Sequence, residues 1–338
     1  EMDRLRIFAL PDMRCVDKGD LVVFNGDKNR APMGIALYKR PKDGAIFAIV
    51  GGKSGPAEGY LGQYRLEDDG TGHVKMTLVR EFGHYSGKKE IEAIAVDAEL
   101  GYVYCSDETV GVRKYRADPD APDANKELAL FGTTGFASDH EGISIYKLND
   151  GTGYILVSDQ QNNAFRIFPR EGTPGQPHNH PLLKSVDVSA IESDGSEVTS
   201  TALPGYPNGL FVAMSNGKVF HYYSWDDIDG TDLKKAPNDV PPVKLTPKKK
   251  KKNRSLSLFA GLLLALPLFG QAPLPDGSLR FLVVGDWGRR GAHHQKETAD
   301  QMGHTATEMS AQFVVATGDN IYDDGVRDVH DSLWKFSF

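Results

Sequence analysis

Short apolar runs separated by glycine-containing turns recur through most of the chain. One unit occurs four times: a small residue opens an apolar run, and a turn leads into a second apolar run. The copies are GIALY (34–38) with AIFAIV (45–50), EAIAVD (92–97) with YVYCSD (102–107), EGISIY (141–146) with YILVSD (154–159), and NGLFVA (208–213) with KVFHYY (218–223). Apolar runs of this length between turn residues predict pairs of short antiparallel strands.

A third apolar run follows the first three units, and each of these runs carries an aromatic residue near its end. They are GQYRL (62–66), VRKYR (112–116) and FRIFPR (165–170). Repeats of roughly 40–50 residues built from such strands are typical of β-propeller blades. We expect Tyr64, Tyr115 and Phe168 to lie in the core between blades. RLRIFAL (4–10) predicts the outer strands of an earlier blade. The sequence therefore predicts an all-β propeller architecture.

The pattern changes at residue 246. A basic run, TPKKKKKNR (246–254), precedes an apolar stretch, SLSLFAGLLLALPLFGQA (255–272). This order matches a secretory signal peptide, and the apolar part is short for a membrane span. We therefore expect no stable membrane span and a secreted or periplasmic protein. A signal peptide in mid-chain indicates two joined reading frames, and an internal anchor or buried helix is the alternative.

The remaining residues predict a different class of fold. SLRFLVVGDWG (278–288), a helical stretch near 292–312, and FVVATGDNIYDDGV (313–326) indicate a strand, a helix and a second strand. Together these patterns divide the chain into a propeller domain (1–240), a basic and apolar linker (241–277) and a short α/β segment (278–338).

Charge and cysteine content exclude several classes of site. The net charge of −7 argues against a nucleic-acid partner, which requires a basic face. Two cysteines, Cys15 and Cys105, are too few for a disulfide framework or a zinc site. The HxH pair of His178 and His180 lies among prolines and glycines, which predicts a solvated loop.

Carboxylates cluster where the first strand of a predicted blade begins and the second strand ends, positions that are cross-strand neighbours. In two consecutive units these residues are Glu92, Asp107 and Glu108, then Asp139, Glu141, Asp159 and Gln160. Like charges opposite each other destabilise a sheet, and a hard cation relieves the repulsion. Ligands that are all oxygen favour calcium over zinc or copper. Alternatively, these residues are solvated loop acids, with Asp107 and Asp159 acting only as strand-end caps.

Bound divalent cations would make this acidic edge suitable for an anionic substrate. They reverse the local charge, lower the pKa of a bound water and hold phosphoryl oxygens in place. The residues alone do not identify the substrate.

Five segments resemble the calcium-dependent β-propeller phytases. They are VGGKSG (50–55), EAIAVDAELGYVYCSDE (92–108), DHEGISIYKLNDGTGYILVSDQQNN (139–163), ESDG (192–195) and YPNGLFVA (206–213). The resemblance implies an incomplete fragment, about four blades, of a six-bladed propeller. It also implies a 3-phytase-type phosphohydrolase, which removes phosphates from phytate (myo-inositol hexakisphosphate) step by step with a calcium-bridged water.

The resemblance further implies roles for particular residues. Glu92, Glu141 and Asp194 are the expected catalytic residues, and Lys53 is expected to bind substrate phosphate. The implied calcium ligands are Glu92, Glu108, Asp139, Glu141, Gln160 and Asp194.

The sequence also departs from the family pattern. Met33 replaces a calcium-binding tyrosine, and Ser200 replaces an acidic ligand for which Glu197 is a substitute. The earlier blades of the family lack counterparts here, so we expect weak or no activity from this chain.

The C-terminal segment resembles the purple acid phosphatases and related metallophosphoesterases. That resemblance implies metal-ligand roles for Asp286, Asp319 and Tyr322 in a centre of iron, zinc or manganese. The later ligand motifs of that family would be needed to complete the centre. Two other functions remain open for the propeller: a calcium-dependent lactonase and a non-catalytic interaction module. The oligomeric state, the number of calcium ions and the position attacked on the inositol ring also remain open.

Overall fold

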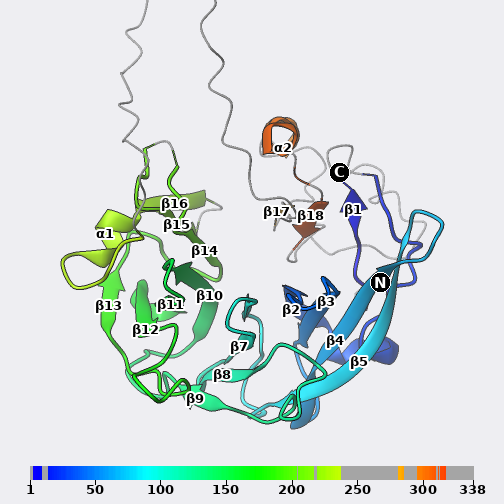
Figure 1. Ribbon diagram of the computed structural model, residues 1–338, viewed down its shortest axis with the longest axis horizontal. Coiled ribbons are helices and arrows are strands. Elements are labelled where there is room, and N and C mark those ends of the chain that lie inside the picture. Colours follow the sequence, from blue (N-terminus) through cyan, green and yellow to red (C-terminus); the bar gives the residue numbers. More distant parts are fainter. Residues whose placement is uncertain are drawn as a thin grey trace, which may run out of the picture.

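The computed structural model describes residues 3–9, 14–203, 205–216, 219–236, 281–284, 295–309, 311 and 313–316. Within these residues, four antiparallel sheets follow one another along the chain and are arranged in an arc (Figure 1). Their first strands are neighbours: β2 contacts β6, β6 contacts β10, and β10 contacts β14. This arrangement of successive meanders around a common interior confirms the predicted propeller architecture.

The first three sheets each contain four strands in sequence order, and the fourth contains three. The first sheet comprises β2 (Pro32–Lys39), β3 (Ile46–Gly52), β4 (Glu58–Asp68) and β5 (Val74–His84). The second comprises β6 (Ile94–Asp97), β7 (Tyr102–Asp107), β8 (Gly111–Arg116) and β9 (Ala129–Phe131). The third comprises β10 (His140–Lys147), β11 (Gly153–Asp159), β12 (Ala164–Pro169) and β13 (Lys184–Asp187). The fourth comprises β14 (Ser196–Thr199), β15 (Leu210–Ser215) and β16 (Val219–Ser224), followed by helix α1 (Trp225–Asp229).

The first three repeated units correspond to the first three strands of their sheets. The fourth unit, at 208–223, differs from the others, since it forms the second and third strands of its sheet, β15 and β16. The first strand of that sheet is β14. The outer strands β5, β9 and β13 were not predicted. In β5 most side chains are exposed or half-buried, so this strand lacks the continuous apolar run that marks the inner strands.

The hydrophobic core lies between neighbouring sheets. One cluster joins Phe47 and Phe82 of the first sheet to Tyr115 of the second. A second cluster joins Tyr104 of the second sheet to Phe168 of the third. A third cluster lies between the third and fourth sheets and includes Trp225. As predicted, Tyr64, Tyr115 and Phe168 are buried.

Buried polar contacts also join the second and third sheets. Arg170 Nε lies 2.5 Å from Asp97 Oδ2, and its Nη2 lies 2.8 Å from Asp97 Oδ1, with both side chains fully buried. His178 and His180 lie in a loop, as predicted, and His178 is half-buried. The prediction that this loop is solvated is wrong for His180, which is 4% exposed. His180 Nε2 lies 3.1 Å from the buried Lys114 Nζ, and its ring packs against Phe131.

The N-terminal segment forms a narrow antiparallel pairing of its own. Bridges join Arg4 to Val22 and Phe8 to Cys15. The Val74 N–H, at the start of β5, donates a hydrogen bond to the Val16 carbonyl oxygen (2.7 Å). Short 3-10 turns η1 (Phe24–Gly26) and η2 (Lys28–Arg30) then lead into β2.

The C-terminal segment forms β17 (Phe281–Val284), α2 (Gln295–Met309) and β18 (Phe313–Ala316). β17 and β18 are parallel, which confirms the predicted strand–helix–strand order. β1 (Phe8–Ala9) pairs antiparallel with the other edge of β18 (Figure 1).

Part of the sequence prediction lies outside the described residues. This part includes the linker (241–277) and the three tail residues Asp286, Asp319 and Tyr322. The division of the chain into three regions at these boundaries therefore stays a prediction. In the described part of the chain, every helix is too short or too polar to cross a membrane.

Candidate functional site

The residues predicted as calcium ligands gather at one edge of three neighbouring sheets. All of them lie at starts of first strands or ends of second strands: Glu92 before β6, Glu108 after β7, Asp139 and Glu141 at the start of β10, Gln160 opening η3 (Gln160–Asn162), and Asp194 before β14. Direct contacts bring these segments together. Ser106 Oγ donates a hydrogen bond to the Glu141 carbonyl oxygen (3.1 Å), and the Gly142 N–H donates to the Asp194 carbonyl oxygen (2.9 Å).

Glycines permit this close packing of neighbouring blades. A Cβ atom on Gly34 in β2 would lie 1.6 Å from the Glu92 carbonyl oxygen. A Cβ atom on Gly142 would lie 2.9 Å from Ser196 N and 3.0 Å from the Asp194 carbonyl oxygen. Gly34 therefore allows β2 to approach the segment of Glu92, and Gly142 allows the start of β10 to approach the segment of Asp194.

We expect Gly142→Ala to displace the segment that carries Asp194. The new methyl group would contact backbone atoms that cannot rotate away, so the fold should lose about 1–3 kcal/mol of stability. Calcium affinity should fall as well, because Asp194 would move away from β10. Urea unfolding and calcium titration calorimetry would measure both effects.

Gly195→Ala is the matched control, because a Cβ atom there would have no neighbour within 4 Å. Equal effects of the two substitutions on stability and on calcium binding would contradict the packing role of Gly142.

Three glutamates form the tightest acidic group at this edge. One carboxylate oxygen each from Glu90, Glu92 and Glu108 lie within 4.8 Å of one another. The sequence prediction missed Glu90. Glu90 could have been predicted, because it lies two residues before Glu92. Alternate residues of an extended segment point to the same side. The Glu108 N–H donates to the Glu90 carbonyl oxygen (3.2 Å), which fixes the two segments against each other.

Glu141 is the most strongly perturbed acid of the group. Its side chain is 5% exposed. Burial, together with neighbouring negative charges, raises the pKa of its carboxyl group to about 10. The charges belong to Glu108, Glu92, Asp194 and Asp139. Among the described residues, Glu141 Oε2 is buried without a hydrogen-bond partner.

Glu108 shows the same features to a smaller degree. It is 2% exposed, and burial raises its pKa to about 7 even though Lys89 opposes the rise. In the described part of the chain, Glu108 Oε1 is also buried without a hydrogen-bond partner. The Lys89 ammonium lies 3.3 Å from Glu108 Oε2 and 2.8 Å from Asp139 Oδ1. The sequence prediction assigned no role to Lys89.

Amide side chains orient the remaining acids. Gln161 Nε2 donates to Asp139 Oδ2 (2.7 Å), and Gln160 Nε2 donates to Asp194 Oδ1. Burial would raise the pKa of Asp139, but hydrogen bonds from Lys89, Ser138 and Gln161 lower it overall. Asp194 itself is exposed.

Asp107 and Asp159, by contrast, form structural ion pairs. Arg113 Nη2 lies 2.7 Å from Asp107 Oδ2, and Arg166 Nη2 lies 2.7 Å from Asp159 Oδ2. Both carboxylates are fully buried. Successive residues of a strand point to opposite sides, so Asp107 pairs with Arg113 while Glu108 faces the acidic group. This result favours the structural interpretation of these two residues.

Lys53 lies directly after β3, and its side chain is exposed. Its N–H donates to the carbonyl oxygens of Arg30 (2.7 Å) and Ala31 (2.8 Å). A Cβ atom on Gly51, two residues earlier, would lie 2.5 Å from the Ile91 carbonyl oxygen. The end of β3 therefore adjoins the segment of Glu90 and Glu92, although no ion pair links Lys53 to another described residue.

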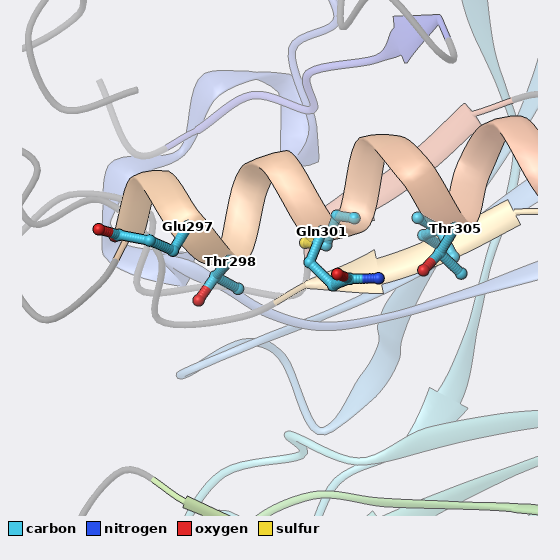
Figure 2. A pocket seen from close by; sticks show the side chains of 6 residues that line it. Glu297, Thr298, Gln301 and Thr305 are labelled. Carbon is cyan, nitrogen blue, oxygen red and sulfur yellow. The ribbon is translucent and has the colours of Figure 1, made fainter. Parts of the chain in front are cut away.

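A cavity among the described residues lies elsewhere, beside α2 and β17 (Figure 2). It has a volume of about 420 Å³ and is lined by Leu282, Glu297, Thr298, Gln301, Met302 and Thr305. None of the predicted calcium ligands lines it. Carboxylate chemistry therefore points to the edge of the propeller and not to this cavity.

The acidic edge has the composition of a site for a hard cation. Its candidate ligands are carboxylate and amide oxygens, which calcium prefers. Buried carboxylates are stable only when they are paired, protonated or bound to a metal. Among the described residues, Glu108 Oε1 and Glu141 Oε2 are buried without a hydrogen-bond partner, and a divalent cation bound by these carboxyl groups would supply one.

Comparison with known proteins identifies two separate regions of similarity. The chain is 32% identical over 208 residues to the 3-phytase of Bacillus subtilis (strain 168), covering 58% of this chain and 52% of that protein. It is 49% identical over 83 residues to purple acid phosphatase 4 of Arabidopsis thaliana, covering 25% of this chain and 24% of that protein. The chain thus spans about half the length of the first relative and about a quarter of the second.

A solved structure of the Cps50 (Swd1) β-propeller domain from Myceliophteria thermophila aligns with 62% of this chain and 59% of that domain, at 12% identity and a TM-score of 0.36. Residues 27–249 match the family model described as Phytase. Because this match covers more than half of the sequence, the chain belongs to the phytase family.

Proposed function

We propose that the propeller region hydrolyses phosphate monoesters of phytate in a calcium-dependent, stepwise manner, as a 3-phytase does. Membership of the phytase family supports a phosphatase-type hydrolase with a small-molecule substrate. The observation that carries the proposal is the buried Glu141 carboxyl group, which lies among four other acids and has one oxygen with no hydrogen-bond partner among the described residues.

The residues of this chain would hold the cation and orient the substrate. Glu90, Glu92 and Glu108 supply the closest set of oxygen ligands, and Glu141 and Asp139 extend it toward the third sheet. Calcium bound there would provide the positive charge that attracts phosphate oxygens and lowers the pKa of water. Lys53, exposed near the same edge, would contact a phosphate of the substrate.

The direct test is release of inorganic phosphate from phytate by the full 338-residue chain, with calcium and with a calcium chelator. We expect slow release that depends on calcium. Release unaffected by the chelator, or a chain that binds no calcium, would contradict the proposal. Calcium-dependent opening of a lactone without phosphate release would favour the lactonase alternative.

We propose separately that residues 278–338 derive from a metallophosphoesterase and that 241–277 contain a secretion signal, so that the protein is exported. The support is the similarity of the tail to purple acid phosphatase 4 and the basic-then-apolar order of the linker. Nucleotide sequencing across codons 248–253 in fresh genomic DNA would show whether the two regions form one reading frame.

A further inference from the structure

Lys89 lies between two carboxylates that belong to different sheets. Its ammonium is 2.8 Å from Asp139 Oδ1 at the start of the third sheet and 3.3 Å from Glu108 Oε2 at the end of β7 in the second sheet. Lys89 itself comes from the segment before β6. Among the described residues, it is the basic side chain that forms ion pairs with both of these acids.

The two partners of Lys89 are buried, whereas Lys89 is not. The side chains of Glu108 and Asp139 are 2% and 9% exposed, and that of Lys89 is 45% exposed. A lysine carries a compact charge on a flexible four-carbon stem. The ammonium can therefore leave these carboxylates for solvent without breaking the packing of the two sheets.

Lys89 and a calcium ion would use the same carboxylates. An ammonium and a divalent cation a few ångströms apart repel each other, so both cannot occupy the pair of Glu108 and Asp139 at once. In the absence of calcium, the ammonium offsets part of the negative charge that Glu90, Glu92, Glu108 and Asp139 bring together.

We propose that Lys89 is a built-in counter-ion, which occupies the Glu108–Asp139 pair when calcium is absent and is displaced when calcium binds. This inference rests on the proposed function, because it requires calcium at the acidic edge. Lys89 thereby stabilises the metal-free fold and sets the calcium concentration at which the site fills.

The test compares Lys89→Met with Lys88→Met in the full chain. Lys88 is the adjacent exposed lysine and serves as the control for loss of a positive charge. Lys89→Met should lower the melting temperature in chelator by about 2–4 °C. It should also lower the calcium concentration at half-saturation, measured by calorimetry, by about three- to tenfold. Lys88→Met should leave both values close to those of the wild type.

Lys89→Arg keeps the charge and should behave like the wild type, which separates the counter-ion role from loss of packing. If the wild type binds calcium and Lys89→Met binds it with unchanged or weaker affinity, the counter-ion proposal is wrong while the proposed function stands. If the wild type binds no calcium, both proposals are wrong.

Discussion

Replacing Glu141 with glutamine is expected to have opposite effects on calcium binding and on stability. The variant should lose calcium affinity by about 100-fold or more, because changes in residues that only support a metal ligand already cost 10–100-fold. Calcium-dependent phosphate release should disappear. In chelator at pH 8, however, the variant should melt about 5–10 °C above the wild type.

The gain in stability follows from the environment of the carboxyl group. Burial and the charges of its neighbours raise the pKa of Glu141 to about 10, so folding at pH 8 forces the group to take up a proton or to stay charged in an apolar place. Each unit of pKa shift corresponds to about 1.4 kcal/mol. The cost at pH 8 is therefore on the order of 3–5 kcal/mol, and a neutral amide avoids most of it.

Thermal unfolding in chelator and calcium calorimetry on the same samples would check this prediction. Glu67→Gln, in β4, is the control because Glu67 is half-exposed and, within the described part of the chain, forms an ion pair with the exposed Arg65 alone. A purely structural role for Glu141 would lower stability in the variant. That result, or unchanged calcium affinity, would refute the assignment.

The second large effect is a fall in the stability of the calcium-free protein as the pH rises from 7 to 8. An ordinary glutamate titrates near 4.5, so in the unfolded chain the Glu141 carboxyl group is ionised throughout this range. In the folded protein, with a pKa of about 10, it keeps its proton. The folded state binds more protons, and stability therefore decreases with pH by about 1.4 kcal/mol per pH unit.

Other titrating groups restrict the pH range in which the decrease in stability caused by Glu141 can be observed. Burial lowers the pKa of His140 and His180, which stabilises the fold as the pH rises toward 6.5. Burial also lowers the pKa of Lys114 to about 8, which stabilises the fold above that pH. Glu108, with a pKa of about 7, adds to the downward slope mainly below pH 7.

Melting temperatures measured at pH 7 and 8 should therefore fall by about 3–5 °C in chelator. With calcium present, Glu141 would be ionised in both states, so the slope should vanish. The Glu141→Gln variant in chelator should show the same loss of slope as the wild type with calcium. A wild type whose melting temperature in chelator is flat or rises over this interval would show that Glu141 is not perturbed.

Local sequence patterns predicted the inner part of the propeller well. Strands β3 and β11 are buried at nearly every position, because both of their faces are covered. The second sheet and the N-terminal segment cover β3, and the second and fourth sheets cover β11. The outer strand β5 is exposed along most of its length. The alternation of apolar and polar residues in β5 is too weak to distinguish a strand from a loop. β5 forms a strand because it pairs with the edge of β4.

Residues of the candidate site could be predicted where their positions in the repeated unit determine that they lie close together. Glu92 and Glu108 follow from the cross-strand geometry of one blade, and Glu141 follows from its repetition in the next. Lys89 could not be found this way, because its contact with Asp139 depends on the distance between two sheets. His180 was misplaced for a similar reason, since its burial depends on Lys114 and Phe131, which come from another sheet.

The central claim is that acids from neighbouring blades share a divalent cation at one edge of the propeller. A crystal structure of the chain grown with calcium tests it most directly. We predict an ion bound by Glu90, Glu92 and Glu108, with Glu141 facing it and the Lys89 ammonium withdrawn from Asp139. A calcium-saturated crystal with no ion at these carboxylates, and with Lys89 still paired to Asp139 and Glu108, would contradict the account.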